Sequence, residues 1–87
     1  MSGPRRIRVL YFAWLRERIG HGREEVETEA ATVAQLVDEL RDREPRYAAA
    51  FADMAAVRVA IDQQLAPLDA ALGQAREVAF FPPMTGG

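Results

Sequence analysis

The chain has 87 residues, of which 49% are hydrophobic and 28% are charged, and its formal net charge is -2. These proportions are typical of one soluble globular domain, too small to hold a separate catalytic domain. The interspersed charges argue against nucleic-acid binding. No apolar run approaches the roughly 20 residues of a membrane span, and the start lacks a signal peptide's apolar segment. We therefore expect a cytoplasmic protein with no membrane partner.

The cysteine, lysine and histidine content limits the kinds of reaction that the side chains could carry out. Without cysteine there is no disulfide, no zinc–thiolate site and no side chain that could carry a persulfide. All eleven basic residues are arginine, which excludes Schiff-base chemistry on lysine. The single histidine, His21, lies between two glycines with no partner nearby in sequence. We expect neither a metal site nor a catalytic dyad around it.

The first predicted element is a strand over residues 7–13, after a flexible N-terminal extension over residues 1–5. One side of the strand carries three apolar residues: Ile7, Val9 and Tyr11. Leu10 and Phe12 occupy the other side, because successive side chains of a strand point to opposite faces. A strand that is apolar on both faces is either covered twice or half-exposed for a partner.

A short helix and a second strand are predicted next. Leu15 and Ile19 share one helical face over residues 14–19, and Gly20 suits the position after the helix end. Residues 24–29 (EEVETE) then alternate as a strand with one solvent-exposed face. The brief connection between the two strands predicts an antiparallel pair.

The clearest helix begins after Thr32. Thr32 and Gln35 form a capping-box pattern, and four apolar residues follow with helical spacing: Val33, Leu36, Val37 and Leu40. Glu39 and Arg43 can pair on the exposed side. Pro45 ends this helix, because it disfavours helical geometry at the residue before it.

Pro45 also suits the first turn of a second helix. Its apolar stripe is more typical of a core than of a cofactor site: Tyr47, Ala50, Phe51 and Met54. Residues 57–61 alternate as a third strand. A short strand around residues 65–66, a helical turn over residues 68–72 ended by Gly73, and a last apolar strand over residues 77–81 complete the order.

Strands separated by helices predict an α+β fold. A first and a last strand that are both apolar belong side by side, in parallel, at the centre of a mixed sheet packed on helices. That arrangement is the ubiquitin-like β-grasp, which we assign to residues 6–81.

The last six residues form a predicted extended tail over 82–87. Pro82 and Pro83 stop the strand before them, because neither has an N–H for a sheet, and they favour an extended, stiff backbone. Gly86 and Gly87 add no side-chain bulk. A terminal carboxylate on Gly87 could therefore enter a channel only as wide as a backbone.

The two ends of the chain, IRVLYFAWLRE (7–17) and EVAFFPPMTGG (77–87), closely resemble the small, sulfur-carrying subunit of molybdopterin synthase, a ubiquitin-like β-grasp family. The resemblance covers nearly the whole chain. One departure is the turn GQAR (73–76), where relatives usually have acidic residues.

The resemblance implies that the chain is not an enzyme by itself and binds no cofactor or metal. A ubiquitin-activating-type enzyme would use ATP to adenylate Gly87, and a persulfide donor would supply sulfur for a thiocarboxylate. The tail, Pro82, Pro83, Met84, Thr85 and Gly86, would bring this group into the large subunit of a heterotetramer. There the sulfur passes to the cyclic pyranopterin precursor of the molybdenum cofactor.

The predicted partner-binding residues are Phe12, Leu65 and Phe81. The alternation of the first and last strands places Phe12 and Phe81 on the same uncovered side, and the family resemblance implies the same contacts.

Other functions stay open at this point. The chain could be a sulfur carrier for thiamine, tRNA thiolation or cysteine synthesis, although the ending FFPPMTGG favours molybdopterin. It could be a ubiquitin-like modifier that couples Gly87 to amines. It could also be an interaction domain with an inert tail.

Overall fold

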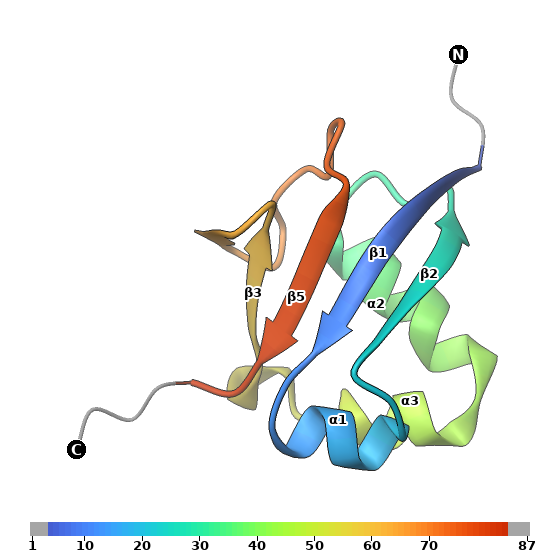
Figure 1. The fold of residues 1–87 in the computed structure, drawn as a ribbon, viewed down its shortest axis with the longest axis vertical. Coiled ribbons are helices and arrows are strands. Elements are labelled where there is room, and N and C mark those ends of the chain that lie inside the picture. The colour runs from blue at the N-terminus through green and yellow to red at the C-terminus, as the bar shows by residue number, and fades with distance from the viewer. Residues whose placement is uncertain (1–3, 84–87) are drawn as a thin grey trace.

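A computed structural model of the chain describes residues 4–83. Figure 1 shows how its helices and strands are arranged. The strands are β1 (Arg5–Tyr11), β2 (Arg23–Thr28), β3 (Arg58–Ile61), β4 (Gln64–Ala66) and β5 (Glu77–Phe81). The helices are α1 (Trp14–Ile19), α2 (Val33–Arg43), α3 (Pro45–Ala50) and the 3-10 helix η1 (Met54–Ala56).

The five strands form one mixed sheet in the order β2-β1-β5-β3-β4. β1 and β5 pair in parallel at its centre, and the other neighbouring strands pair antiparallel. The predicted parallel pairing of the first and last strands is therefore confirmed, and the fold is an α+β, ubiquitin-like β-grasp. Helix α2 lies behind the sheet in Figure 1, which leaves the opposite face without a helix over it.

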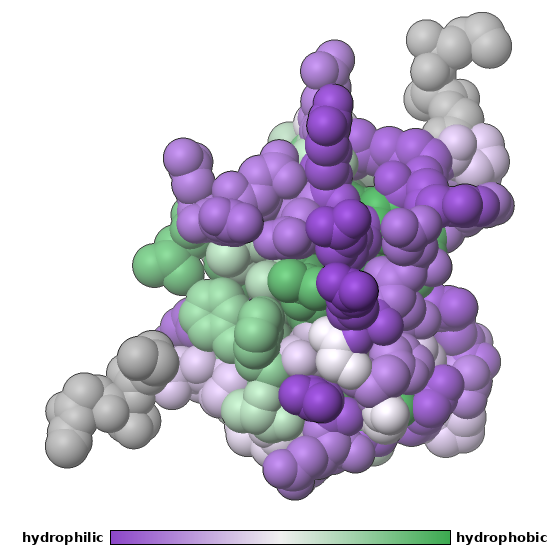
Figure 2. Space-filling model, in the orientation of Figure 1, coloured by the Kyte–Doolittle hydropathy of each residue, from purple (hydrophilic) through white to green (hydrophobic). Residues whose placement is uncertain are grey.

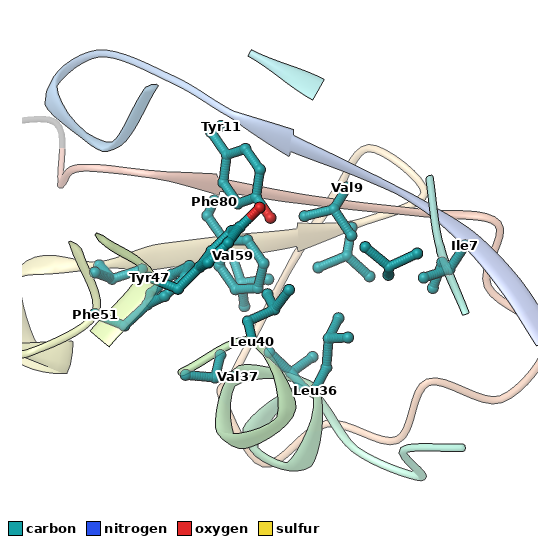
Figure 3. Close-up of a cluster of buried hydrophobic side chains, with 14 of the residues drawn as sticks. Ile7, Val9, Tyr11, Leu36, Val37, Leu40, Tyr47, Phe51, Val59 and Phe80 are labelled. Atoms are coloured by element: carbon teal, nitrogen blue, oxygen red, sulfur yellow. The ribbon is translucent and has the colours of Figure 1, made fainter. Parts of the chain in front are cut away.

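The core lies between the sheet and the helices. Alternate residues of β1 and β5 point into it and are at most 1% exposed: Ile7, Val9, Tyr11, Val78 and Phe80. Figure 3 shows Leu36, Val37 and Leu40 of α2 directed at these strand residues. The rings of Phe51 and Phe80 meet edge to face, with centroids 5.0 Å apart. The core is thus built from the faces that the alternation and the helical stripes predict.

The helix ends follow the local sequence. Gly20 closes α1 in the left-handed region, with φ 103°. The Thr32 hydroxyl accepts a hydrogen bond from the backbone N–H of Gln35 at 3.2 Å, and the Gln35 side chain accepts one from Ala31 at 2.7 Å. Pro45 begins α3 as expected.

Two local predictions are wrong. Residues 68–72 do not form a helical turn, because their backbone pairs with the start of α2: Val33 donates to Ala70, and Leu72 donates to Ala31. Glu39 and Arg43 do not pair either. Glu39 instead accepts a hydrogen bond from Thr28, and Arg43 lies 3.6 Å from Glu24.

The start of the sheet includes Arg5, which pairs with Thr28. Pro4 is exposed and precedes the sheet, and residues 1–3 of the predicted extension lie outside the described residues. Among residues 4–83, no helix is both long and apolar enough to cross a membrane.

Candidate functional site

The face of the sheet opposite the helices carries an apolar row across four strands. Strand register places Leu10 beside Ala79, Ala79 beside Ala60, and Ala60 beside Leu65. Directly paired residues of neighbouring strands point to the same face. Phe81 follows one alternation further along β5, and Phe12 comes directly after β1, with its N–H bonded to the carbonyl of Phe80. We call these six residues the apolar half of the open face.

The large side chains at the ends of the apolar half are more exposed than their neighbours in the core, whereas Ala60 and Ala79 between them are buried. Phe12 is 48% exposed and Leu65 is 78% exposed, whereas Tyr11 and Phe80 are at most 1% exposed. Phe81 is half-buried. Figure 2 shows a contiguous hydrophobic group on this face, with hydrophilic side chains above it and to its right. A contiguous exposed apolar group of this kind marks a docking surface.

The other half of the same face is charged and internally paired. Arg6 lies 3.8 Å from Glu25 and 3.6 Å from Glu27, and Arg8 lies 4.0 Å from Glu77. We call these five residues the charged half. Exposed ion pairs of this kind contribute little to stability, but they leave the charged half nearly neutral.

The backbone fixes Phe12 at the border between sheet and helix. The Phe12 N–H donates to the Phe80 carbonyl at 3.0 Å, and the Phe12 carbonyl accepts from Leu15 at 3.2 Å. Ala13 then adopts φ 56° and ψ -133°. A residue with a Cβ in such a conformation costs about 1–3 kcal/mol. The fold therefore tolerates strain in order to turn the chain directly after Phe12.

The predicted tail begins directly after Phe81 of the apolar half, with Pro82 and Pro83. Pro82 and Pro83 are half-buried and lie outside the sheet. In Figure 1 the chain leaves β5 on the side away from α1 and β2. The remaining predicted site residues, Met84, Thr85, Gly86 and Gly87, lie outside the described residues. Their roles stay predictions.

A polar cluster that sequence reasoning missed lies at the end of β1. The hydroxyls of Tyr11 and Tyr47 both donate to the Glu24 carboxylate at 2.7 Å. His21 Nε2 lies 3.2 Å from the same carboxylate oxygen, and Arg43 lies 3.6 Å from the other. His21 therefore has a carboxylate partner three residues away, contrary to the expectation from sequence. No group of three or more metal-ligating side chains is found within residues 4–83.

The cluster shifts the pKa values of its members. Burial raises the pKa of Tyr47 to about 12, and hydrogen bonding to Glu24 adds to the effect; the pKa of Tyr11 is raised for the same reasons. Burial alone would raise the pKa of Glu24. Hydrogen bonds from Tyr47, Tyr11 and His21 and the charge of Arg43 outweigh burial, so the pKa of Glu24 is lowered. Glu24 is thus an ionised anchor for the end of β1.

The family model described as the ThiS family matches residues 9–87. The chain belongs to the ThiS family. Molybdopterin synthase sulfur carrier subunits of Haemophilus influenzae and Escherichia coli are 38% and 40% identical to it. Both matches cover 93% of this chain and 99% of the relative. The resemblance predicted from the two chain ends is therefore confirmed.

This ThiS-family chain is also similar to a solved structure. SAMP1, the small archaeal modifier protein 1 of Haloferax volcanii, superposes with a TM-score of 0.72 at 26% identity. The match covers 95% of this chain and 100% of that chain. The chain is thus similar in sequence to relatives named for sulfur carriage and in fold to a relative named for modification.

Proposed function

We propose that this chain is a sulfur carrier in molybdenum cofactor biosynthesis and that it carries sulfur on Gly87. The observation that carries the proposal is the near end-to-end match with two molybdopterin synthase sulfur carrier subunits, each covered over 99% of its length. The family model also extends to Gly87. The exposed apolar half beside the segment that leads to the tail supports a docking role.

The chemistry begins at the Gly87 carboxylate, which is ionised at neutral pH because its pKa lies near 3.5. A carboxylate is a poor electrophile, so a ubiquitin-activating-type enzyme first transfers AMP to it from ATP and releases pyrophosphate. The resulting acyl adenylate has a good leaving group. The outer sulfur of a persulfide donor then displaces AMP, which joins Gly87 to the donor through an acyl disulfide. A thiol reduces this disulfide, which releases the donor and leaves a thiocarboxylate on Gly87.

The thiocarboxylate then enters the large subunit of molybdopterin synthase, which supplies the catalytic pocket. Its sulfur is transferred to the cyclic pyranopterin precursor, and water restores the Gly87 carboxylate. In this scheme, Phe12, Leu65 and Phe81 contact the large subunit. Desolvating half-exposed aromatic and aliphatic side chains supplies affinity without a change in the carrier's own core.

The similarity to SAMP1 favours one alternative, a protein modifier. Both functions share the acyl adenylate and differ in the nucleophile that attacks it. Sulfur attack gives a thiocarboxylate, whereas attack by a lysine amine of another protein gives an amide.

Intact-mass measurement tests the proposal directly. The full chain is incubated with ATP, its activating enzyme, a persulfide donor and a reducing thiol. We expect a mass increase equal to the replacement of one oxygen by sulfur. A chain lacking Gly87 is the control and is expected to fold normally and gain no sulfur, because every residue of the described sheet and core is kept.

The second step of the assay adds the large subunit and the pyranopterin precursor. Loss of the sulfur mass together with formation of molybdopterin supports the carrier function. Amide-linked adducts without a thiocarboxylate would instead support the modifier. Full activity of the chain lacking Gly87 would contradict both.

A further inference from the structure

Two arginines border the apolar half of the open face. Arg23 pairs in register with Leu10 at one side of the apolar row, and Arg58 pairs with Phe81 toward the other side. Both arginines are exposed. Because paired residues share a face, these two side chains belong to the same surface as Phe12 and Leu65.

Arg58 is held in place by backbone carbonyls. Its guanidinium donates to the carbonyl oxygens of Ala55 at 3.3 Å and Val57 at 3.2 Å. A guanidinium has five N–H donors, so these two acceptors leave capacity for a carboxylate. The contacts also reduce the freedom that a docking partner would otherwise have to restrict. Arg58 is therefore an oriented cation next to Phe81.

Arg23 precedes two glutamates that are already engaged elsewhere. Glu24 points to the core side of β2, where it binds Tyr11, Tyr47, His21 and Arg43. Glu25 lies on the open face but is 3.8 Å from Arg6. Within residues 4–83, no carboxylate lies at ion-pair distance from either Arg23 or Arg58.

The charged half of the same face provides the contrast. Arg6 and Arg8 each pair with a glutamate of a neighbouring strand. The open face therefore has its arginine charges compensated where it is polar and uncompensated where it is apolar.

We infer that the protein docked on the apolar half presents two carboxylates, one to Arg23 and one to Arg58, around an apolar centre. The inference rests on the proposed function and takes the large subunit as the occupant. Docking removes water from the edges of the apolar half, and a cation that loses water without gaining a carboxylate opposes binding. Three strand spacings of about 4.8 Å separate β2 from β3, so the strand backbones that carry the two arginines lie roughly 15 Å apart.

The predicted partner surface has the usual composition of an interface, with an apolar centre and a polar rim. Its specific feature is that the rim carries negative charge. Acidic residues opposite Arg23 and Arg58 would favour this carrier over a β-grasp protein that has acidic or neutral residues at those positions.

Binding measurements with charge-reversed variants test this inference. Titration calorimetry compares the full chain with Arg58→Glu, Arg23→Glu and the matched control Arg6→Glu, each against the large subunit. All three variants change the net charge equally. We expect Arg58→Glu and Arg23→Glu each to weaken binding by about tenfold or more, and Arg6→Glu by less than about threefold. Arg58→Lys should retain most of the affinity, because it keeps the charge.

Each other outcome identifies what has failed. Equal weakening by all three variants would overturn the inference and indicate an effect of net charge instead. Unchanged binding of Arg23→Glu and Arg58→Glu would also overturn the inference, because neither arginine would then meet a carboxylate. In both cases, thiocarboxylate formation and binding of the unaltered chain would leave the proposed function standing. Circular dichroism checks that each variant is folded. Failure of the unaltered chain to bind the large subunit would overturn both proposals.

Discussion

The two faces of β1 and β5 differ in what their side chains do, although they belong to the same strands. On one face, Val9, Tyr11, Val78 and Phe80 are at most 1% exposed and hold the helices to the sheet. On the other, the apolar side chains of Leu10 and Phe81 remain partly exposed. The buried residues of the first face stabilise the fold. A docking partner accounts for the exposed apolar residues of the second.

Truncating adjacent phenylalanines should separate the two faces most clearly. Phe80→Ala removes a fully buried ring that packs on Tyr11 and Phe51. We expect it to lower the free energy of unfolding by about 3–5 kcal/mol. Phe81→Ala removes a half-buried ring on the open face and should cost less than about 1.5 kcal/mol. Urea unfolding measures both, and similar losses would mean that Phe81 belongs to the core.

Glu24 sharpens the comparison, because it is an acid on the core-side face of β2. Its pKa is lowered in the folded state, so it stabilises the fold above its unfolded pKa of about 4.3. This contribution is lost as the pH falls through the folded pKa. Glu24→Gln should therefore destabilise the chain by about 1–3 kcal/mol at neutral pH, and the difference from the unaltered chain should shrink in acid.

The control for this experiment is Glu25→Gln, because Glu25 is the neighbouring exposed acid on the open face. Urea unfolding at neutral pH and near pH 3 is compared for the three proteins, which cancels the titration of shared acids. We expect Glu25→Gln to follow the unaltered chain closely. A Glu24→Gln deficit that is independent of pH would show that the carboxylate charge is not what stabilises the cluster.

The sequence predicted those parts of the fold that depend on local pattern. The extent of α1, the cap at Thr32 and the alternation of β1 and β5 all follow from neighbouring residues. The prediction of a helical turn over residues 68–72 is wrong because the hydrogen-bond partners of this segment, at the start of α2, are distant in sequence. Local pattern carries no information on such pairing.

The polar cluster was missed for a similar reason. Glu24 shares its side of β2 with Val26 and Thr28, which could have marked it as facing the core rather than solvent. Its partners Tyr47 and Arg43 lie on helices, where the sequence pattern identifies Tyr47 only as a core position and Arg43 only as a surface position. The arginines around the apolar half became distinctive only when strand register showed which other charges are paired.

The smallest expected effect on stability comes from Phe12→Asp, and it bears most directly on the open face. Phe12 is 48% exposed, and its fixed backbone hydrogen bonds do not involve the side chain. We expect the free energy of unfolding to change by less than about 1 kcal/mol, while affinity for the large subunit falls by about tenfold or more, because a carboxylate replaces an aromatic contact. Calorimetry and urea unfolding on the same preparation give both quantities.

Phe12→Leu is the matched control and should keep most of the affinity, since it preserves an apolar contact. A loss of stability comparable to that of Phe80→Ala would place Phe12 in the core, and the open face would then need another explanation for its exposed apolar residues.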